Sequence, residues 1–236
     1  MEAVILAGGL GTRLRSVVSD VPKPMAPVNG RPFLEHLIEY WIRQGVQRFI
    51  LSVGYRHEKI QRHFGTRYGH AGMDYAVERE PLGTGGGFLL ALEQVTGDRC
   101  LVLNGDTFFE VPLRELDSEH DNGCAVVTLS LFEAPPGGRY LGVDLAEDGE
   151  VRRFGVTAAQ GKTFCNGGVY MIARNAFAGM AFRPGEACSL ESDLLTGLRQ
   201  HGGLVRGFVS HGFFIDIGVP EDYLRAQALF SGGNQA

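Results

Sequence analysis

The residues of this chain best suited to chemistry stand near its start, in a glycine-rich stretch that follows a short apolar run. The stretch reads Leu6-Ala7-Gly8-Gly9-Leu10-Gly11-Thr12-Arg13-Leu14, and Lys23-Pro24 follows it. Glycine lets a backbone approach a ligand closely, so successive N–H groups can point at an anion. Arg13 adds a planar, permanently charged donor, and Lys23 adds a mobile positive charge. Together these residues predict a site for a polyphosphate.

Two aspartates are candidates to hold a divalent cation. Asp106 closely follows an apolar run at residues 100–103, and ligands of α/β sheets bind at the carboxyl ends of strands. A carboxylate there suits Mg²⁺, which prefers oxygen ligands; the alternative is that Asp106 only shapes a turn. Because one carboxylate fixes Mg²⁺ weakly, a second is expected. Asp216 stands among apolar residues, where an unpaired charge is costly; the alternative is that it caps the following helix.

The composition limits the partners of the chain. It has 236 residues, 44% of them hydrophobic, and a net charge of −5, which argues against broad binding to nucleic acid or to an anionic membrane. The four cysteines have no Cys-x-x-Cys spacing, so we expect free thiols in a reducing compartment. The sequence shows neither a spanning apolar stretch nor a signal-peptide pattern, and we therefore expect a cytoplasmic protein.

The first half of the chain alternates strand-like and helix-like segments that must position these side chains. Strands are expected at residues 4–6, 49–53, 75–77 and 100–103, and helices at 32–44, 57–64 and 86–94. Such alternation predicts an α/β fold, Rossmann-like, in which a mostly parallel sheet is sandwiched by helices.

The second half is richer in β structure. Strands are expected at residues 125–131, within 163–172, at 205–210 and at 213–217, and a turn at 146–149 joins 140–145 to 150–154 as a hairpin. Ser189 is placed to cap a helix that extends to about residue 200, and Pro220 to open a final helix. We expect residues 1–230 to form a single domain, followed by a flexible tail at 231–236.

The glycine-rich stretch differs from better-known phosphate-binding loops. It lacks the Gly-Lys-Ser/Thr of a Walker loop, and Leu14 stands where a dinucleotide fingerprint needs a third glycine. With Lys23-Pro24 it resembles instead the signature of sugar-1-phosphate nucleotidylyltransferases, and the resemblance extends from Met1 to about residue 230. It implies the nucleotide-diphospho-sugar transferase fold, with a β-rich sugar-binding portion.

The same resemblance implies roles for the charged residues. Arg13, Lys23 and Asp106 would be catalytic, and Asp106 and Asp216 would hold Mg²⁺ as the cofactor. These residue types suit phosphoryl transfer, which depends on positioning and charge neutralisation and needs no nucleophilic side chain.

A second segment, residues 78–86, is expected beside the base. Relatives that use UTP or dTTP generally carry glutamine where Glu78 stands. Guanine presents two neighbouring N–H donors, which suit a carboxylate, so Glu78 or Glu80 favours GTP; the alternative is that these glutamates face solvent. The nucleotide-binding residues implied are Leu6, Ala7, Gly8, Gly9, Gly11, Thr12, Glu78, Pro81, Gly83, Thr84, Asn104 and Gly105.

Three later segments, at residues 140–143, 166–170 and 189–193, resemble the sugar-phosphate half of the family's site. They imply that Gly142, Asn166, Gly167 and Glu191 bind the sugar. The chain departs from many relatives after its hairpin, because it lacks the Glu-Lys-Pro whose lysine binds the sugar's phosphate. Arg152, Arg153 and Lys162 are all candidates to replace that lysine.

The resemblance implies GTP and a sugar 1-phosphate as substrates. Residues 18–25, 81–86 and 104–109 are most similar to the branch whose acceptor is a heptose 1-phosphate. The expected reaction transfers a guanylyl group and releases pyrophosphate. Alternatives are mannose-1-phosphate guanylyl transfer, uridylyl transfer to another sugar 1-phosphate, and binding of a nucleotide sugar without catalysis. The sugar's stereochemistry, the number of metal ions and the oligomeric state, a homo-oligomer included, stay open.

Overall fold

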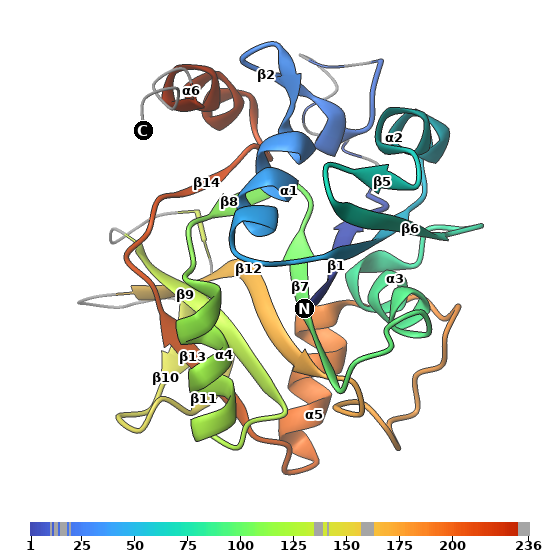
Figure 1. Ribbon diagram of the computed structural model, residues 1–236. Coiled ribbons are helices and arrows are strands. Elements are labelled where there is room, and N and C mark those ends of the chain that lie inside the picture. Colours follow the sequence, from blue (N-terminus) through green and yellow to red (C-terminus); the bar gives the residue numbers. More distant parts are fainter. Residues whose placement is uncertain are drawn as a thin grey trace.

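The computed structural model describes residues 1–9, 11, 14, 18, 20–134, 139–140, 142–156 and 163–230. Within them, one sheet has the strand order β11-β10-β12-β7-β1-β4-β6-β5; β9 pairs with β12, and β13 pairs with β9. Figure 1 shows this sheet crossing the molecule, with helices packed along it. None of the described helices combines the length and the apolar character that crossing a membrane requires.

Four parallel strands form the centre of the sheet. They are β7 (Arg99–Asn104), β1 (Glu2–Ala7), β4 (Arg48–Val53) and β6 (Ala71–Val77). Their sequences are almost continuously apolar, as expected of parallel strands covered on both faces. In β1, Ala3 and Ile5 belong to the core on one face and Val4 to the core on the other. The predicted mostly parallel sheet between helices is confirmed.

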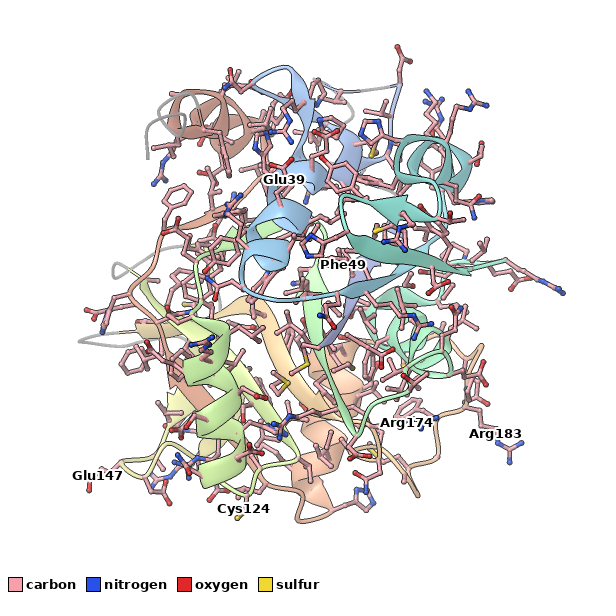
Figure 2. The ribbon with its side chains drawn as sticks, in the orientation of Figure 1. Glu39, Phe49, Cys124, Glu147, Arg174 and Arg183 are labelled. Carbon is pink, nitrogen blue, oxygen red and sulfur yellow. The ribbon has the colours of Figure 1, made fainter. Side chains whose placement is uncertain are left out.

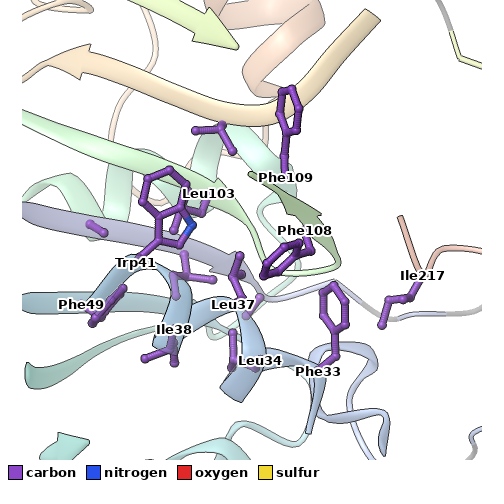
Figure 3. Packing of buried hydrophobic residues seen from close by; sticks show 14 of the residues in the cluster. Phe33, Leu34, Leu37, Ile38, Trp41, Phe49, Leu103, Phe108, Phe109 and Ile217 are labelled. Carbon is purple, nitrogen blue, oxygen red and sulfur yellow. The ribbon is translucent and has the colours of Figure 1, made fainter. Parts of the chain in front are cut away.

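The helices divide between the two faces of the sheet. On one face lie α1 (Phe33–Arg43), α2 (His57–Phe64), α4 (Leu113–Asn122) and α6 (Pro220–Phe230), and on the other α3 (Gly83–Leu92) and α5 (Thr196–Gln200). Helix α1 packs on the sheet because its apolar residues repeat at helical spacing and form one buried stripe. Figure 3 shows this stripe: Phe33, Leu34, Leu37, Ile38 and Trp41.

The second half of the chain extends the sheet with antiparallel strands. These are β9 (Val127–Ala134), β10 (Gly142–Leu145), β11 (Val151–Val156) and β12 (Thr163–Ala173), and β13 (Val205–Val209) runs parallel to β9. Strand β12 pairs with β7, which joins this half to the parallel half. The predicted hairpin between β10 and β11 is confirmed: Gly149 has φ +87° and donates its N–H to the Ala146 carbonyl at 3.0 Å.

The last part of the chain returns to the centre of the molecule. β14 (Phe214–Asp216) pairs antiparallel with β8 (Thr107–Phe109), which sets Asp216 opposite Thr107. Ser189 caps a helical segment as predicted, because its side chain accepts a hydrogen bond from the N–H of Ser192 at 3.2 Å. That segment begins as the π-helix η3 (Leu190–Leu195) and continues as α5. Short elements complete the fold: η2 (Lys23–Met25), β2 (Pro27–Val28), β3 (Arg31–Pro32) and β5 (Arg67–Tyr68).

Some elements have no counterpart among the sequence predictions. Helix α4 is mostly polar, and only Leu113, Leu116 and His120 are buried along it. Strands β8 and β5 are too short to show a pattern. The four cysteines are free, as predicted, with Cys124 exposed beyond the end of α4 (Figure 2). The tail at 231–236 lies outside the described residues, so the domain extent stays a prediction.

Candidate active site

The carboxyl ends of the central parallel strands meet at one edge of the sheet, where a first cavity of about 380 Å³ opens. The predicted nucleotide-binding residues that line it are Leu6, Ala7, Gly8, Gly9, Gly11, Glu78, Pro81, Gly83, Thr84 and Asn104. A second cavity, of about 690 Å³, is lined by predicted sugar-binding residues. Asn104 and Asp106 line both cavities, so the two halves of the predicted site are neighbours.

The glycine-rich turn leaves β1 and passes close to Lys23. Gly11 has φ +58°, and a Cβ atom there would come within 2.9 Å of the Lys23 Cβ. Both the dihedral and the close approach therefore require glycine. Thr12 and Arg13 lie outside the described residues, so their predicted roles stay predictions.

Glu78 follows β6, and its carboxylate lies against the turn. A Cβ atom at Gly8 would come within 1.9 Å of Glu78 Oε1, so a larger residue there would displace the carboxylate from its present position. The hydroxyl of Ser52 donates to Oε1 at 2.9 Å, and the N–H of Leu82 donates to Oε2 at 3.1 Å. These bonds fix the carboxylate in the wall of the first cavity, whereas Glu80 is exposed and outside that lining.

Lys23 stands between the two predicted metal-binding aspartates. Its ammonium group contacts Asp106 and lies 3.9 Å from Asp216 Oδ1, and its side chain is only 10% exposed. Burial, and then the negative charge of Asp106, raises the pKa of the Asp216 carboxyl above its ordinary value. The site thus gathers two carboxylates that repel each other and a lysine that holds them together.

The chemistry of these groups fits a magnesium ion. Asp106 follows β7 and Asp216 ends β14, and the pairing of β14 with β8 brings the two carboxylates to one place. Among the described residues, no group of three or more His, Cys, Asp or Glu side chains is arranged to hold a metal. Mg²⁺ does not need one, because it commonly takes one or two carboxylates and completes its shell with water and substrate phosphates. Asp216 Oδ1 also accepts from the N–H of Gly218 at 2.6 Å, a bond that orients the carboxylate in the turn before α6.

Asn166 and Glu191, which line the second cavity, are joined by hydrogen bonds through the buried Tyr170. Asn166 Nδ2 donates to the Tyr170 hydroxyl at 2.6 Å, and that hydroxyl donates to Glu191 Oε1 at 2.8 Å. Thr84 of α3 donates to Glu191 Oε2 at 3.3 Å, which connects these hydrogen bonds to the wall of the first cavity. Burial, and then the charge of Glu191, raises the pKa of Tyr170, so its hydroxyl keeps the proton that it donates. Gly142 lines the same cavity.

Two of the predicted site residues that the structure describes do not line either cavity. Gly105 donates its N–H to the Leu6 carbonyl at 2.9 Å, so it helps to close the sheet edge beneath the site. A Cβ atom at Gly167 would lie 2.3 Å from the Phe109 ring; its neighbour Gly168 lines the second cavity instead.

The described candidates to replace the lysine that binds the sugar's phosphate in many relatives do not line the second cavity. Arg152 and Arg153 are exposed on β11 and outside its lining, and Lys162 lies outside the described residues. The residues of the site that were not predicted from the sequence include Ser52, which orients Glu78, and Arg139, which lines the second cavity. A serine inside an apolar strand was the one available signal for Ser52.

Comparisons with known proteins agree with this geometry. The family model described as nucleotidyl transferase matches residues 2–231. The D-glycero-alpha-D-manno-heptose 1-phosphate guanylyltransferase of Aneurinibacillus thermoaerophilus is 41% identical over 227 residues, covering 96% of this chain and 97% of that enzyme. The enzyme of the same description from Campylobacter jejuni is 39% identical, covering 94% of this chain and 97% of its own length.

A solved structure extends the likeness to the backbone. HddC from Yersinia pseudotuberculosis is 36% identical and matches with a TM-score of 0.85, over 97% of this chain and 99% of its own. The same protein complexed with GMP-PN matches with a TM-score of 0.83. The resemblance drawn from the glycine-rich stretch is confirmed.

Proposed function

This chain belongs to the nucleotidyl transferase family, and we propose that it transfers the guanylyl group of GTP to D-glycero-α-D-manno-heptose 1-phosphate. An oxygen of the sugar's phosphate attacks the α-phosphorus of GTP. The bond from that phosphorus to the bridging oxygen breaks, so the products are GDP-heptose and pyrophosphate. The observation that carries the proposal is the meeting of the two cavities at Lys23, Asp106 and Asp216.

The residues of the first cavity would bind GTP. The N–H groups of the turn at residues 8–13 would bind the triphosphate, while Arg13 and Lys23 would neutralise the charge that builds up as pyrophosphate leaves. Glu78 would accept hydrogen bonds from the N1–H and the amino group of guanine. Each of its oxygens already accepts one bond from the protein, and a carboxylate oxygen has room for another.

The residues of the second cavity would bind the acceptor. Asn166 and Glu191 would hydrogen-bond the sugar hydroxyls, and the Gly142 backbone would contact the ring. Asp106 and Asp216 would hold Mg²⁺, which when bound would neutralise phosphate charge and align the two substrates. We propose the cytoplasm as the compartment, where GTP is available, and a role in making activated heptose for lipopolysaccharide, capsule or S-layer glycans.

Pyrophosphate release tests the proposal. GTP, UTP, dTTP and CTP would each be offered with heptose, mannose and glucose 1-phosphates in the presence of Mg²⁺. We expect the highest kcat/KM for GTP with the heptose phosphate. A strong preference for UTP would refute the proposed role of Glu78. A higher kcat/KM with mannose 1-phosphate would show that mannose 1-phosphate, and not the heptose phosphate, is the acceptor. Tight nucleotide binding with no turnover on any sugar would instead indicate a protein that binds without catalysis.

A further inference from the structure

The second cavity is lined by negatively charged side chains, although the acceptor that it would bind is itself negatively charged. It is lined by Asp106, Asp216 and Glu191, yet its substrate would carry a phosphate dianion. A phosphate placed beside carboxylates is repelled unless cations neutralise it. Among the described lining residues of this cavity, Arg139 is the one lysine or arginine.

Arg139 is held in a fixed position by groups from several elements. Its Nη2 donates to Asp216 Oδ2 at 2.8 Å and to the Tyr140 hydroxyl at 2.7 Å, and its Nη1 lies 2.8 Å from Asp222 Oδ2 of α6. The guanidinium carbon lies 4.8 Å from the centre of the Tyr140 ring, within the range of a cation–π contact. That ring packs in turn against Phe214 of β14, with centroids 5.6 Å apart. Arg139 is therefore oriented before any ligand arrives.

We infer that Arg139 binds the phosphate of the acceptor sugar 1-phosphate and positions its attacking oxygen; this inference rests on the proposed function. The attacking oxygen must lie beside the metal ion that Asp216 would hold. Since Arg139 is bonded directly to Asp216, a phosphate at that place would lie close to its guanidinium group. A guanidinium has five donors in a planar fork that matches a phosphate, so it can serve this ligand and its protein partners together.

The other cations near this wall are less suited to the task. Arg153 pairs with Asp144 on the hairpin at 3.2 Å, and its side chain is 74% exposed. Exposed pairs of this kind are screened by solvent and contribute little. Lys23 contacts Asp106 and lines the first cavity, where the triphosphate would bind.

The test compares Arg139→Gln and Arg139→Lys with a matched control, Arg153→Gln, which also removes an arginine paired with an aspartate. Steady-state kinetics would give kcat and both KM values, and calorimetry would give the Kd of heptose 1-phosphate. For Arg139→Gln we expect the KM and Kd of the sugar phosphate to rise about 10- to 100-fold, the size of a lost charge-assisted hydrogen bond. Arg139→Lys should recover part of this loss, because it keeps the charge without the fork.

The KM of GTP should change less than about twofold in either variant, and Arg153→Gln should behave as the wild type. If Arg139 only neutralises Asp216, the GTP KM and kcat will change in Arg139→Gln while the Kd of the sugar phosphate stays the same, and the inference is overturned. A wild-type enzyme that binds heptose 1-phosphate without turnover would overturn the proposed function alone, since weaker binding by Arg139→Gln would still support the role of Arg139.

Discussion

At the scale of single residues, Lys23 explains how two carboxylates coexist in a largely buried site. The ammonium group contacts Asp106 and approaches Asp216, while Arg139 contacts Asp216 from the other side. Lys23 and Arg139 carry two positive charges, while Asp106, Asp216 and Asp222, which they contact, carry three negative charges. The region that both aspartates face therefore attracts further positive charge, which is the electrostatic condition for binding a divalent ion.

Replacing Asp106 with asparagine tests that condition directly. Asp106→Asn keeps the shape of the side chain and removes its charge, so we expect kcat to fall on the order of 10²–10³-fold, as when one preorganised charge-stabilising group is lost. The measurement is pyrophosphate release across a range of Mg²⁺ concentrations. Circular dichroism serves as the control for folding. A kcat near that of the wild type would remove Asp106 from the metal role.

Tyr170 offers a second test, because its hydroxyl holds both Asn166 and Glu191. Tyr170→Phe should raise the KM of the sugar phosphate about tenfold, since Asn166 and Glu191, which line the cavity, both lose the hydroxyl that orients them. The KM of GTP should not change. Tyr75→Phe is the matched control, because its hydroxyl donates to the Gly65 carbonyl on the surface, away from both cavities. Equal changes in the two KM values would show that Tyr170 acts through the general fold.

At the scale of elements, the start of α3 joins the two cavities. Gly83 and Thr84 line the first cavity, and Thr84 also contacts Glu191. The segment before η3 lies directly on this helix end: the Cys188 carbonyl accepts from the N–H of Gly85 at 2.9 Å. Glycines at the helix start allow this close contact between the helix and the segment, because a Cβ atom at Gly85 would come within 2.8 Å of the Ser189 backbone.

A single methyl group added at Gly86 should push the start of α3 away from the segment before η3. A Cβ atom at Gly86 would come within 2.2 Å of the Glu186 carbonyl oxygen, a backbone atom that cannot easily yield. We expect Gly86→Ala to lower the free energy of unfolding by about 1–3 kcal/mol, measured by urea denaturation. The control is Gly197→Ala in α5, where the crowded atom is the flexible end of Met180. That variant should be neutral or slightly stabilised by helix propensity. Similar losses in both would contradict the close contact at Gly86.

Elements with strong local patterns could be predicted from the sequence. The parallel strands, α1 and the hairpin at 146–149 follow from apolar runs, helical spacing and turn residues. Helix α4 was not predicted because most of its residues are polar, and β8 was not predicted because a three-residue strand has no periodicity. The position of Arg139 could not be predicted, since its partner Asp216 is 77 residues away along the chain and only the tertiary structure brings the two together.

At the scale of the whole molecule, the sheet divides the core in two, and α4 closes one face away from the site. His120 on this helix is 5% exposed, and its Nδ1 lies 3.0 Å from the Thr128 hydroxyl of β9. Burial, and then the charge of Arg99, lowers its pKa below the ordinary 6.5, while Asp121 and Asp117 act in the opposite direction. The folded protein therefore favours the neutral imidazole.

The pH dependence of stability follows from this depressed pKa. Well above pH 6.5 His120 is neutral in both the folded and the unfolded chain, so its titration has no effect on stability there. As the pH falls, the unfolded chain takes up the proton first, and the free energy of unfolding must decrease. We expect the wild type to lose more stability than His120→Gln between pH 7.5 and pH 5.5 in urea denaturation. A difference between the two proteins that stays constant with pH would contradict this assignment.

The common wall formed by Asn104 and Asp106 has a practical consequence for inhibitor design. Fragments that bind weakly in the first and second cavities would lie almost end to end, separated by little more than the side chains of that wall. A short tether between such fragments would give the second a high effective concentration once the first is seated. Chemists could therefore obtain a potent compound by fusing two modest ones.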